Sequence, residues 1–230
     1  MATSGTVSAT TFKVNQIIDL AYHRCKIGPY LITGEMLEHA KDSLYIILSD
    51  LANTSPPSWC ISSTSLTMTA SVTYVSCPQG TISVRHVLYK DGTRETSLGR
   101  LTLDQYALLP DKTFTGRPTS YYVKRETSGV KVYLWPTPDT TAATKSLSLW
   151  YLRHVMDCPT YAEDLDIPQR WLEAIIAELA YRLSIISEEA KPEMIQVLKA
   201  QAKESLMTAW TGDNDGAKLM IAPNISCYNA

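Results

Sequence analysis

The chain has 230 residues, of which 45% are hydrophobic, enough to build the core of one sizeable domain or of two small ones. Its 21 basic and 23 acidic residues leave a formal net charge of -2, and no block of like charge stands out, which argues against a protein that binds nucleic acid through a concentrated basic patch. No run of roughly 18 apolar residues occurs, and the first residues carry neither a charged nor an apolar leader, so we expect no transmembrane helix, no signal peptide and no membrane partner.

Cysteine and histidine spacing carries no metal or disulfide signature. The five cysteines include no C-x-x-C pair, and the histidines do not follow the H-x-x-x-H spacing of zinc sites. We therefore expect reduced thiols in a cytosolic compartment, with neither a metal nor a cofactor. These residues are Cys25, Cys60, Cys77, Cys158 and Cys227, with His23, His39, His86 and His154.

Residues 1–11 are predicted to be a flexible N-terminus, and residues 12–54 a helical hairpin. Apolar residues recur at three- and four-residue spacing from Val14 to Cys25, which indicates a first helix that ends at the Gly-Pro pair just beyond. Thr33 is a suitable N-cap for a second helix. That helix is expected to end near Asn53, because two prolines follow it and cannot continue it.

Residues 55–160 are predicted to form an inserted β-domain. The apolar pattern changes here to a period of two, and serine, threonine, valine and tyrosine dominate, which indicates the short strands of a small sandwich or barrel. Asp91-Gly92 predicts a tight turn, whereas residues 101–106 fit either a strand or a short helical turn after Thr102. The predicted strands are residues 65–68, 72–75, 82–89, 121–125, 130–135 and 146–152.

The most strongly patterned stretch runs from Gly116 to Asp139 and predicts a β-hairpin at the centre of this domain. Two strand-like runs flank a Ser128-Gly129 turn, and the apolar residues of 130–134 alternate onto one face. The prolines after Trp135 are expected to end the pairing, because proline brings no N–H. The structural motif residues assigned here are Gly116, Arg117, Pro118, Tyr121, Tyr122, Trp135, Pro136 and Pro138.

Residues 161–210 are predicted to be C-terminal helices that pack with residues 12–54. Pro168 falls near the first helical position, where its missing N–H costs nothing, and Trp171 opens a wide apolar face on the strongest helix of the chain. A last helix is expected from about Pro192 to Trp210. The predicted fold class is therefore α+β, a bundle of N- and C-terminal helices with an inserted antiparallel β-sandwich or barrel-like domain.

Residues 211–230 are predicted to be an extended C-terminal tail. The stretch from Thr211 to Gly216 has the composition of a flexible linker, and it leads to a small apolar cluster with no obvious place in the protein's own core. We expect this cluster to dock on a partner. Its residues are Leu219, Met220 and Ile221.

Two groups of residues could carry chemistry, although a structural role is the stronger interpretation of each. His154 and Cys158 lie four residues apart and could form a catalytic pair, but most single cysteines are inert small hydrophobes. Glu163, Asp164 and Asp166 could serve acid–base catalysis or bind a cation, but acidic residues before a helix also complement its dipole. No serine nucleophile or phosphate-binding loop occurs, so we expect no enzymatic activity.

The aromatic residues of the hairpin suggest an alternative function. Tyr121, Tyr122, Tyr133 and Trp135 could form a platform on which a glycan or a nucleic-acid base stacks, with basic residues nearby. Aromatic residues are also favoured on sheets and in sandwich cores, which is the stronger interpretation. Arg117 could likewise bind an anion, although a surface or interdomain salt bridge explains it more simply.

Several motifs follow one another in a recognisable order along the chain. The most specific are the turn Gly116-Arg117-Pro118-Thr119 and the later run Leu134-Trp135-Pro136-Thr137-Pro138. The others are Ile18–Cys25, Leu31–Glu35, Trp59, Tyr106 and Leu165–Trp171. Over about residues 12 to 210 the chain resembles the head-to-tail adaptors of short-tailed bacteriophages, the family often called tail tubular protein A or head–tail connector. Stopper and neck proteins of related design share parts of this layout.

The resemblance implies a non-enzymatic structural protein of the virion, made in the host cytoplasm and placed at the head–tail junction. It implies a homo-oligomeric ring, typically of twelve copies, that binds the portal protein and meets a tail nozzle or tail tubular protein. The helices would surround the DNA channel, and the β-domain would face outward or toward the tail. DNA would pass during genome ejection without sequence-specific binding, and a near-neutral chain is compatible with such sliding.

Overall fold

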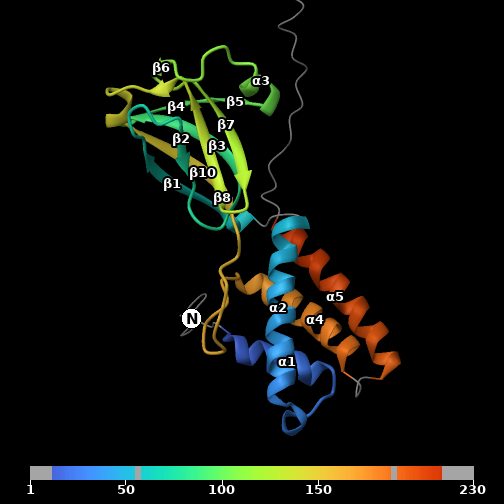
Figure 1. Cartoon of the computed structure of the whole chain (residues 1–230). Coiled ribbons are helices and arrows are strands. Elements are labelled where there is room, and N and C mark those ends of the chain that lie inside the picture. The colour runs from blue at the N-terminus through green and yellow to red at the C-terminus, as the bar shows by residue number, and fades with distance from the viewer. Residues whose placement is uncertain (1–11, 55–57, 188–190, 214–230) are drawn as a thin grey trace, which may run out of the picture.

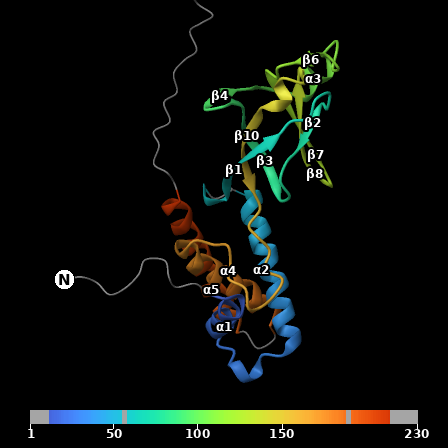
Figure 2. The same ribbon diagram turned by 90° about the vertical axis from the view of Figure 1, so that its left-hand side faces the viewer.

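The computed structural model describes residues 12–54, 58–187 and 191–213, and these residues form a helical part and a β part that lie end to end (Figures 1 and 2). The helical part contains elements from both ends of the described chain, and the β part contains the segment between them. The predicted flexible N-terminus and the apolar cluster Leu219–Ile221 lie outside the described residues.

Helix α4 is the centre of the helical part, because α1, α2 and α5 all pack against it. Two short 3-10 turns, η1 after α1 and η2 after α2, complete this part of the chain. The elements are α1 Val14–Arg24, η1 Pro29–Leu31, α2 Gly34–Thr54, η2 Ser58–Cys60, α4 Gln169–Ile186 and α5 Pro192–Gly212.

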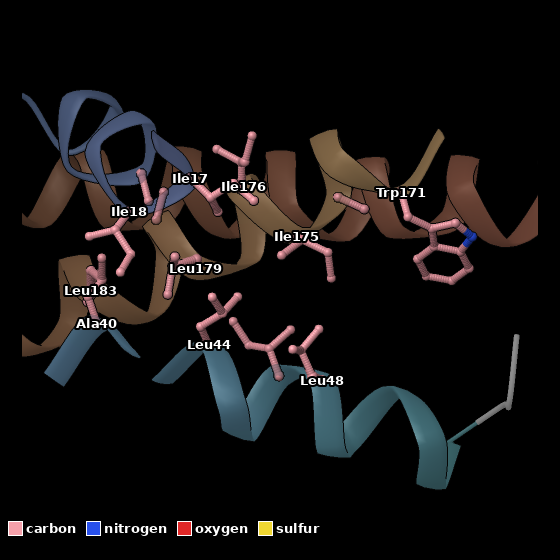
Figure 3. Close-up of a cluster of buried hydrophobic side chains, with 14 of the residues drawn as sticks. Ile17, Ile18, Ala40, Leu44, Leu48, Trp171, Ile175, Ile176, Leu179 and Leu183 are labelled. Carbon is pink, nitrogen blue, oxygen red and sulfur yellow. The ribbon is translucent and has the colours of Figure 1, made fainter. Parts of the chain in front are cut away.

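The predicted apolar stripes of these helices meet in one buried cluster, shown in Figure 3. The α4 face carries the largest share, and Trp171, Ile175 and Leu179 are fully buried. Ile186, predicted on the same face, is 57% exposed. It lies at the end of α4 and borders an open hollow that Tyr22 and Met36 also line.

The helix ends follow the predicted caps in part. The backbone N–H of Met36 donates to the hydroxyl of Thr33 at 3.3 Å, which confirms Thr33 as a cap of α2. Pro168 is the N-cap of α4 and not its first helical residue. Helix α1 ends at Arg24, earlier than predicted, because Lys26 has a left-handed φ of 62° that the helix cannot accommodate.

The β part contains two four-stranded sheets and one short parallel pair. The first sheet has the order β1-β10-β3-β4 and is antiparallel, and the second has the order β2-β8-β7-β5, in which only β5 and β7 run parallel. The elements are β1 Ile61–Thr67, β2 Tyr74–Ser76, β3 Thr81–Asp91, β4 Arg94–Ser97, β5 Gly99–Leu101, α3 Leu103–Ala107, β6 Thr115–Gly116, β7 Ser120–Glu126, β8 Gly129–Trp135, β9 Thr137–Pro138, η3 Ala142–Thr144 and β10 Ser146–Arg153.

Buried residues of the two sheets form a single cluster, with Val87 and Leu149 from the first sheet and Val132 and Leu134 from the second. Within the described residues no strand pairs with both sheets, so the β part is not a closed barrel. The mixed helix-and-sheet class and the mainly antiparallel pairing agree with the predicted α+β class.

The six predicted strands occur as β1, β2, β3, β7, β8 and β10, although their bounds shift by a few residues. The Asp91-Gly92 turn joins β3 to β4, with Asp91 opposite Arg94. The undecided stretch is helix α3, capped by Thr102, whose hydroxyl accepts from the N–H of Gln105 at 3.2 Å. The strands β4, β5, β6 and β9 were not predicted.

The patterned hairpin β7–β8 occupies the middle of the second sheet, and its two-residue turn is Thr127-Ser128, one residue earlier than expected. The hairpin ladder ends at Trp135, as the prolines predicted, but Thr137 and Pro138 then form a further strand, β9, which pairs with β6. The pairing uses the N–H groups between and after the prolines: Thr137 donates to the Phe114 carbonyl at 2.9 Å and Asp139 to the Gly116 carbonyl at 3.3 Å. The missing proline N–H groups are therefore not needed there.

Candidate functional site

The connection between the two parts is held by Asp213 at the end of α5. Its carboxylate accepts a hydrogen bond from the Ser58 backbone N–H at 2.7 Å and forms an ion pair with Arg170 of α4. Burial opposes ionisation, but the Ser58 and Arg170 contacts outweigh it, so the pKa of Asp213 is lowered. Helix α5 therefore reaches Gly212, and the prediction of a flexible linker from Thr211 onward is wrong for its first residues.

The second connection between the parts is held by Arg153 at the end of β10. Its guanidinium forms a bidentate ion pair with Asp166, with 3.2 Å between Nη2 and Oδ1. Asp166 also accepts from the Met156 N–H at 3.2 Å. The contacts with Arg153 and the Met156 N–H thus account for the Asp166 carboxylate. Its contribution at the dipole of α4 stays a prediction.

The other two acidic residues of the cluster do not join Asp166 in a site. Glu163 caps a local turn through the Thr160 N–H at 3.4 Å, and its carbonyl accepts from the Val14 N–H at 3.0 Å. Asp164 pairs through its backbone with Lys13. In the described part of the chain no group of three histidine, cysteine or acidic residues is placed to hold a metal.

No hydrogen bond joins His154 to Cys158 among the described residues, and the thiol instead contacts the Met156 and Asp164 carbonyls, so the two residues do not form a catalytic pair in this structure. His154 borders a hollow of about 550 Å³ between α2 and the end of β10, and Cys158 one of about 320 Å³ beside Lys41. The Cys158 thiol lies 3.5 Å from the Asp164 carbonyl, and burial raises its pKa. A raised pKa is the opposite of what an activated thiolate requires.

The Gly116-Arg117-Pro118 turn connects the hairpin to the first sheet. The Arg117 guanidinium lies 4.6 Å from the centre of the Tyr89 ring in β3 and donates to the Thr96 hydroxyl in β4 at 3.2 Å. Pro118 is buried. Arg117 therefore makes a cation–π contact instead of the expected salt bridge. At Gly116 an added Cβ would meet only ordinary contacts, so sterics do not require glycine there.

The predicted aromatic platform is divided between two faces of the second sheet. Tyr121 is 3% exposed and belongs to the core. Tyr122 and Tyr133 lie on the outer face, joined there by Tyr106, whose ring centre is 5.1 Å from Tyr122 and 5.7 Å from Tyr133. The indole N–H of Trp135 donates to the Asp111 carbonyl at 3.0 Å. The outer rings thus stack largely on one another, which weakens the binding-module alternative.

Exposed apolar side chains gather at both ends of the molecule. At one end η1, between α1 and α2, presents Tyr30 and Leu31, which are 101% and 54% exposed. At the other end the α3 region of the β part presents Leu103, Leu108 and Phe114, which are 60%, 82% and 55% exposed (Figure 1). Clustered exposed apolar residues mark surfaces that contact other proteins, so the molecule has a candidate contact surface at each end.

Sequence reasoning missed the junction residues Ser58, Arg153 and Asp213, because their partners are far away in the sequence. It also missed Tyr74 and most of the role of Tyr106, which complete the outer tyrosine cluster. Their position on the same face as Tyr133 depends on strand pairing that no local pattern reveals.

The sequence model of the SU10 adaptor protein family matches residues 43–220. No curated protein matches the chain. None of the described helices has the length and apolar character needed to cross a membrane.

Proposed function

We propose, because the chain belongs to the SU10 adaptor protein family of phage head-to-tail adaptors, that its copies form a ring that joins the portal to the tail and surrounds the DNA channel. Family membership gives the chain a structural adaptor role in a virion and implies association with portal and tail components. The family is not known for enzymatic activity. The match over residues 43–220 is the observation that carries the proposal.

The two exposed ends support a protein that bridges two partners. An adaptor between portal and tail needs one surface for each neighbour, and the apolar residues around η1 and around α3 lie at opposite ends of the long axis. The helical part would surround the channel, and the β part would face outward or toward the tail tubular protein or nozzle. The near-neutral net charge of -2 is compatible with a channel wall past which DNA slides without sequence-specific binding.

A ring of twelve copies is the assembly that the resemblance implies. A closed ring requires a heterologous interface, in which one surface of a copy meets a different surface of the next. It also requires a subunit of defined shape. The ion pairs of Asp213 and Arg153 support this, since each holds one of the chain crossings between the helical and β parts.

The chain is proposed to be organised as a helical bundle, residues 12–54 with 161–210, into which a β-sandwich, residues 55–160, is inserted. Two separate buried clusters support this division. Cys60, Leu152 and Val155 belong to the buried cluster of the helical part, so the end of the β part that lies next to the helices packs against them. The residues Leu219–Ile221 are proposed, from the sequence, to dock on a neighbouring subunit or the portal.

Mass photometry of the full chain with and without its portal tests the proposed function. The portal complex should gain mass by a whole number of copies, with twelve as the expected number. A chain that stays monomeric and adds no mass to the portal would refute the adaptor ring.

A further inference from the structure

Helix α2 presents an acidic outer face with an apolar centre. Its exposed residues recur at the three- and four-residue spacing of one helix side. Tyr45 and Ile46 lie in this face and are 57% and 51% exposed, although the other side of the helix supplies the core. We call this surface the α2 acidic face; its residues are Glu35, Glu38, His39, Asp42, Tyr45, Ile46 and Asp50.

Helix α5 presents a second exposed stripe, which combines apolar or small residues with lysines. Val197 and Met207 are 51% and 62% exposed and Ala200 lies between them. Lys199 and Lys203 follow one edge of the stripe, and neither forms an ion pair within the described residues. We call this surface the α5 outer face; its residues are Gln196, Val197, Lys199, Ala200, Lys203, Glu204, Met207 and Thr208.

The two faces point in different directions, because α4 lies between α2 and α5 (Figures 1 and 2). The two faces of one copy therefore cannot contact each other. Each helix spans 21 residues, or about 32 Å at 1.5 Å per residue. Both helices run toward the β part, and their C-terminal ends are tied together there by Ser58 and Asp213.

This common end sets the two helices at one height. Tyr45 and Ile46 lie nine and eight residues before the end of α2 at Thr54, and Lys203 and Glu204 lie nine and eight residues before the end of α5 at Gly212. A ring axis that runs from the helical part toward the β part keeps residues at similar distances from this common end at similar levels, although α5 is inclined to α2 (Figure 1). The pair in α2 then meets the stretch of α5 between Ala200 and Met207.

We infer that the α5 outer face of one copy packs against the α2 acidic face of the next copy, and this inference rests on the proposed ring. Tyr45 and Ile46 would lie between Ala200 and Met207, which brings exposed apolar surface out of water. Asp42, which forms no ion pair within the described residues, would meet the lysine edge of α5. The two faces are different surfaces of the chain, as a closed cyclic interface requires.

Charge also favours this pairing over one between two identical faces. On the α2 acidic face Glu38 pairs with Lys41 and Asp50 with Arg182 of the same copy. Asp42 keeps its negative charge without such an ion pair in the described residues, so two such faces would bring like charges together. Glu204 lies on the α5 outer face away from the lysine edge and opposes the contact. We expect Glu204→Gln to strengthen assembly for that reason.

Thiol cross-linking of the full chain on portal particles tests the contact. In a background that carries Cys77→Ser, Cys158→Ser and Cys227→Ser, which removes the native thiols that are not buried in the described residues and Cys227, chains with Ile46→Cys alone or Ala200→Cys alone should give no cross-linked dimer with a short bis-maleimide. A mixture of the two should give dimers, and the double variant should give a ladder up to the full ring. Dimers of either single variant, or no ladder from the double variant, would overturn the inference.

Charge reversal gives an independent readout. Asp42→Lys and Lys203→Asp should each lower ring occupancy on the portal by roughly tenfold or more, because every interface of the ring then pairs like charges. The double variant should restore occupancy. Asp19→Lys, at an exposed position on α1 that belongs to neither face and to neither apolar end, is the matched control and should change nothing.

The outcomes separate the inference from the proposed function. If wild-type rings form but both single charge variants match them, or if the double variant is no better than either, the assignment of the faces is wrong and the ring stands. If the wild-type chain adds no copies to the portal, the proposed function itself fails.

Discussion

Removal of the Asp213 carboxylate should destabilise the protein by about 2–3 kcal/mol. The side chain is 4% exposed and accepts the Ser58 N–H at 2.7 Å, and a charge-assisted hydrogen bond of this kind contributes about 1.5–3 kcal/mol. The ion pair with Arg170 adds little, at most about 1 kcal/mol, because Arg170 is 49% exposed and solvent screens the pair. Asp213→Ala loses both contacts and leaves the Ser58 N–H without its acceptor.

Urea unfolding followed by far-ultraviolet circular dichroism measures this effect. Asp213→Asn keeps an acceptor for the Ser58 N–H and should lose about 1 kcal/mol, roughly half of the alanine effect. Glu204→Ala, an exposed acidic position on the same helix, serves as the control and should stay within about 0.5 kcal/mol of the wild type. An Asp213→Ala protein as stable as this control would refute the assigned role of Asp213.

The pH dependence gives a second check with a defined sign. The pKa of Asp213 is lowered in the folded protein from its ordinary value of 3.8. Its contribution is therefore present in full above that value and is lost as the pH falls through the lower folded pKa. The stability difference between the wild type and Asp213→Ala should be constant near neutral pH and shrink below about pH 4. A difference that grows on acidification would contradict the argument.

Three further predictions concern the core, the turn before the hairpin and the thiols. Trp171→Ala should lower the free energy of unfolding in urea by about 3–5 kcal/mol. Trp171→Phe should lower it much less, since the buried indole N–H of Trp171 has no hydrogen-bond partner in the described structure. Equal losses from the two variants would contradict this. Arg117→Ala should lower the free energy of unfolding by about 1 kcal/mol through its contact with Tyr89, with Arg117→Lys intermediate. Cys158, whose pKa burial raises, should react with iodoacetamide at pH 7 more slowly than a peptide thiol does, and mass spectrometry of the modified site would reveal the contrary.

Local sequence patterns predicted many of the helices and strands, because the periodicity of each depends only on residues that are close together in the sequence. The three- and four-residue spacing of apolar residues in α1, α2, α4 and α5 predicted these helices, since one face of each must be buried whatever its neighbour is. Alternation predicted β8 with Val130, Val132 and Leu134 inward, and these residues are buried. The adaptor resemblance likewise came from motifs that can be read along the chain, and the match to residues 43–220 agrees with it.

Short strands escaped prediction because their existence depends on a partner. The strands β5, β6 and β9 have two or three residues each, too few for any periodicity. They form only where Gly99–Leu101 meets β7 and where Thr115–Gly116 meets β9. The prolines correctly predicted the end of the hairpin ladder at Trp135. They did not reveal β9, since a proline can lie in a strand where its missing N–H does not face the partner.

Composition and periodicity by themselves determined an α+β chain with amphipathic helices, alternating strands and no recognisable catalytic motif. Only the tertiary structure decided what the polar residues do. It showed that Asp166 and Asp213 hold the junction between the two parts, that Tyr121 is buried while Tyr133 faces outward, and that α2 and α5 expose different faces. The physical reason is the separation in sequence between the residues involved. The periodicity of apolar residues is a property of each segment alone, whereas a charged side chain can pair with a distant residue only after folding brings the two segments together.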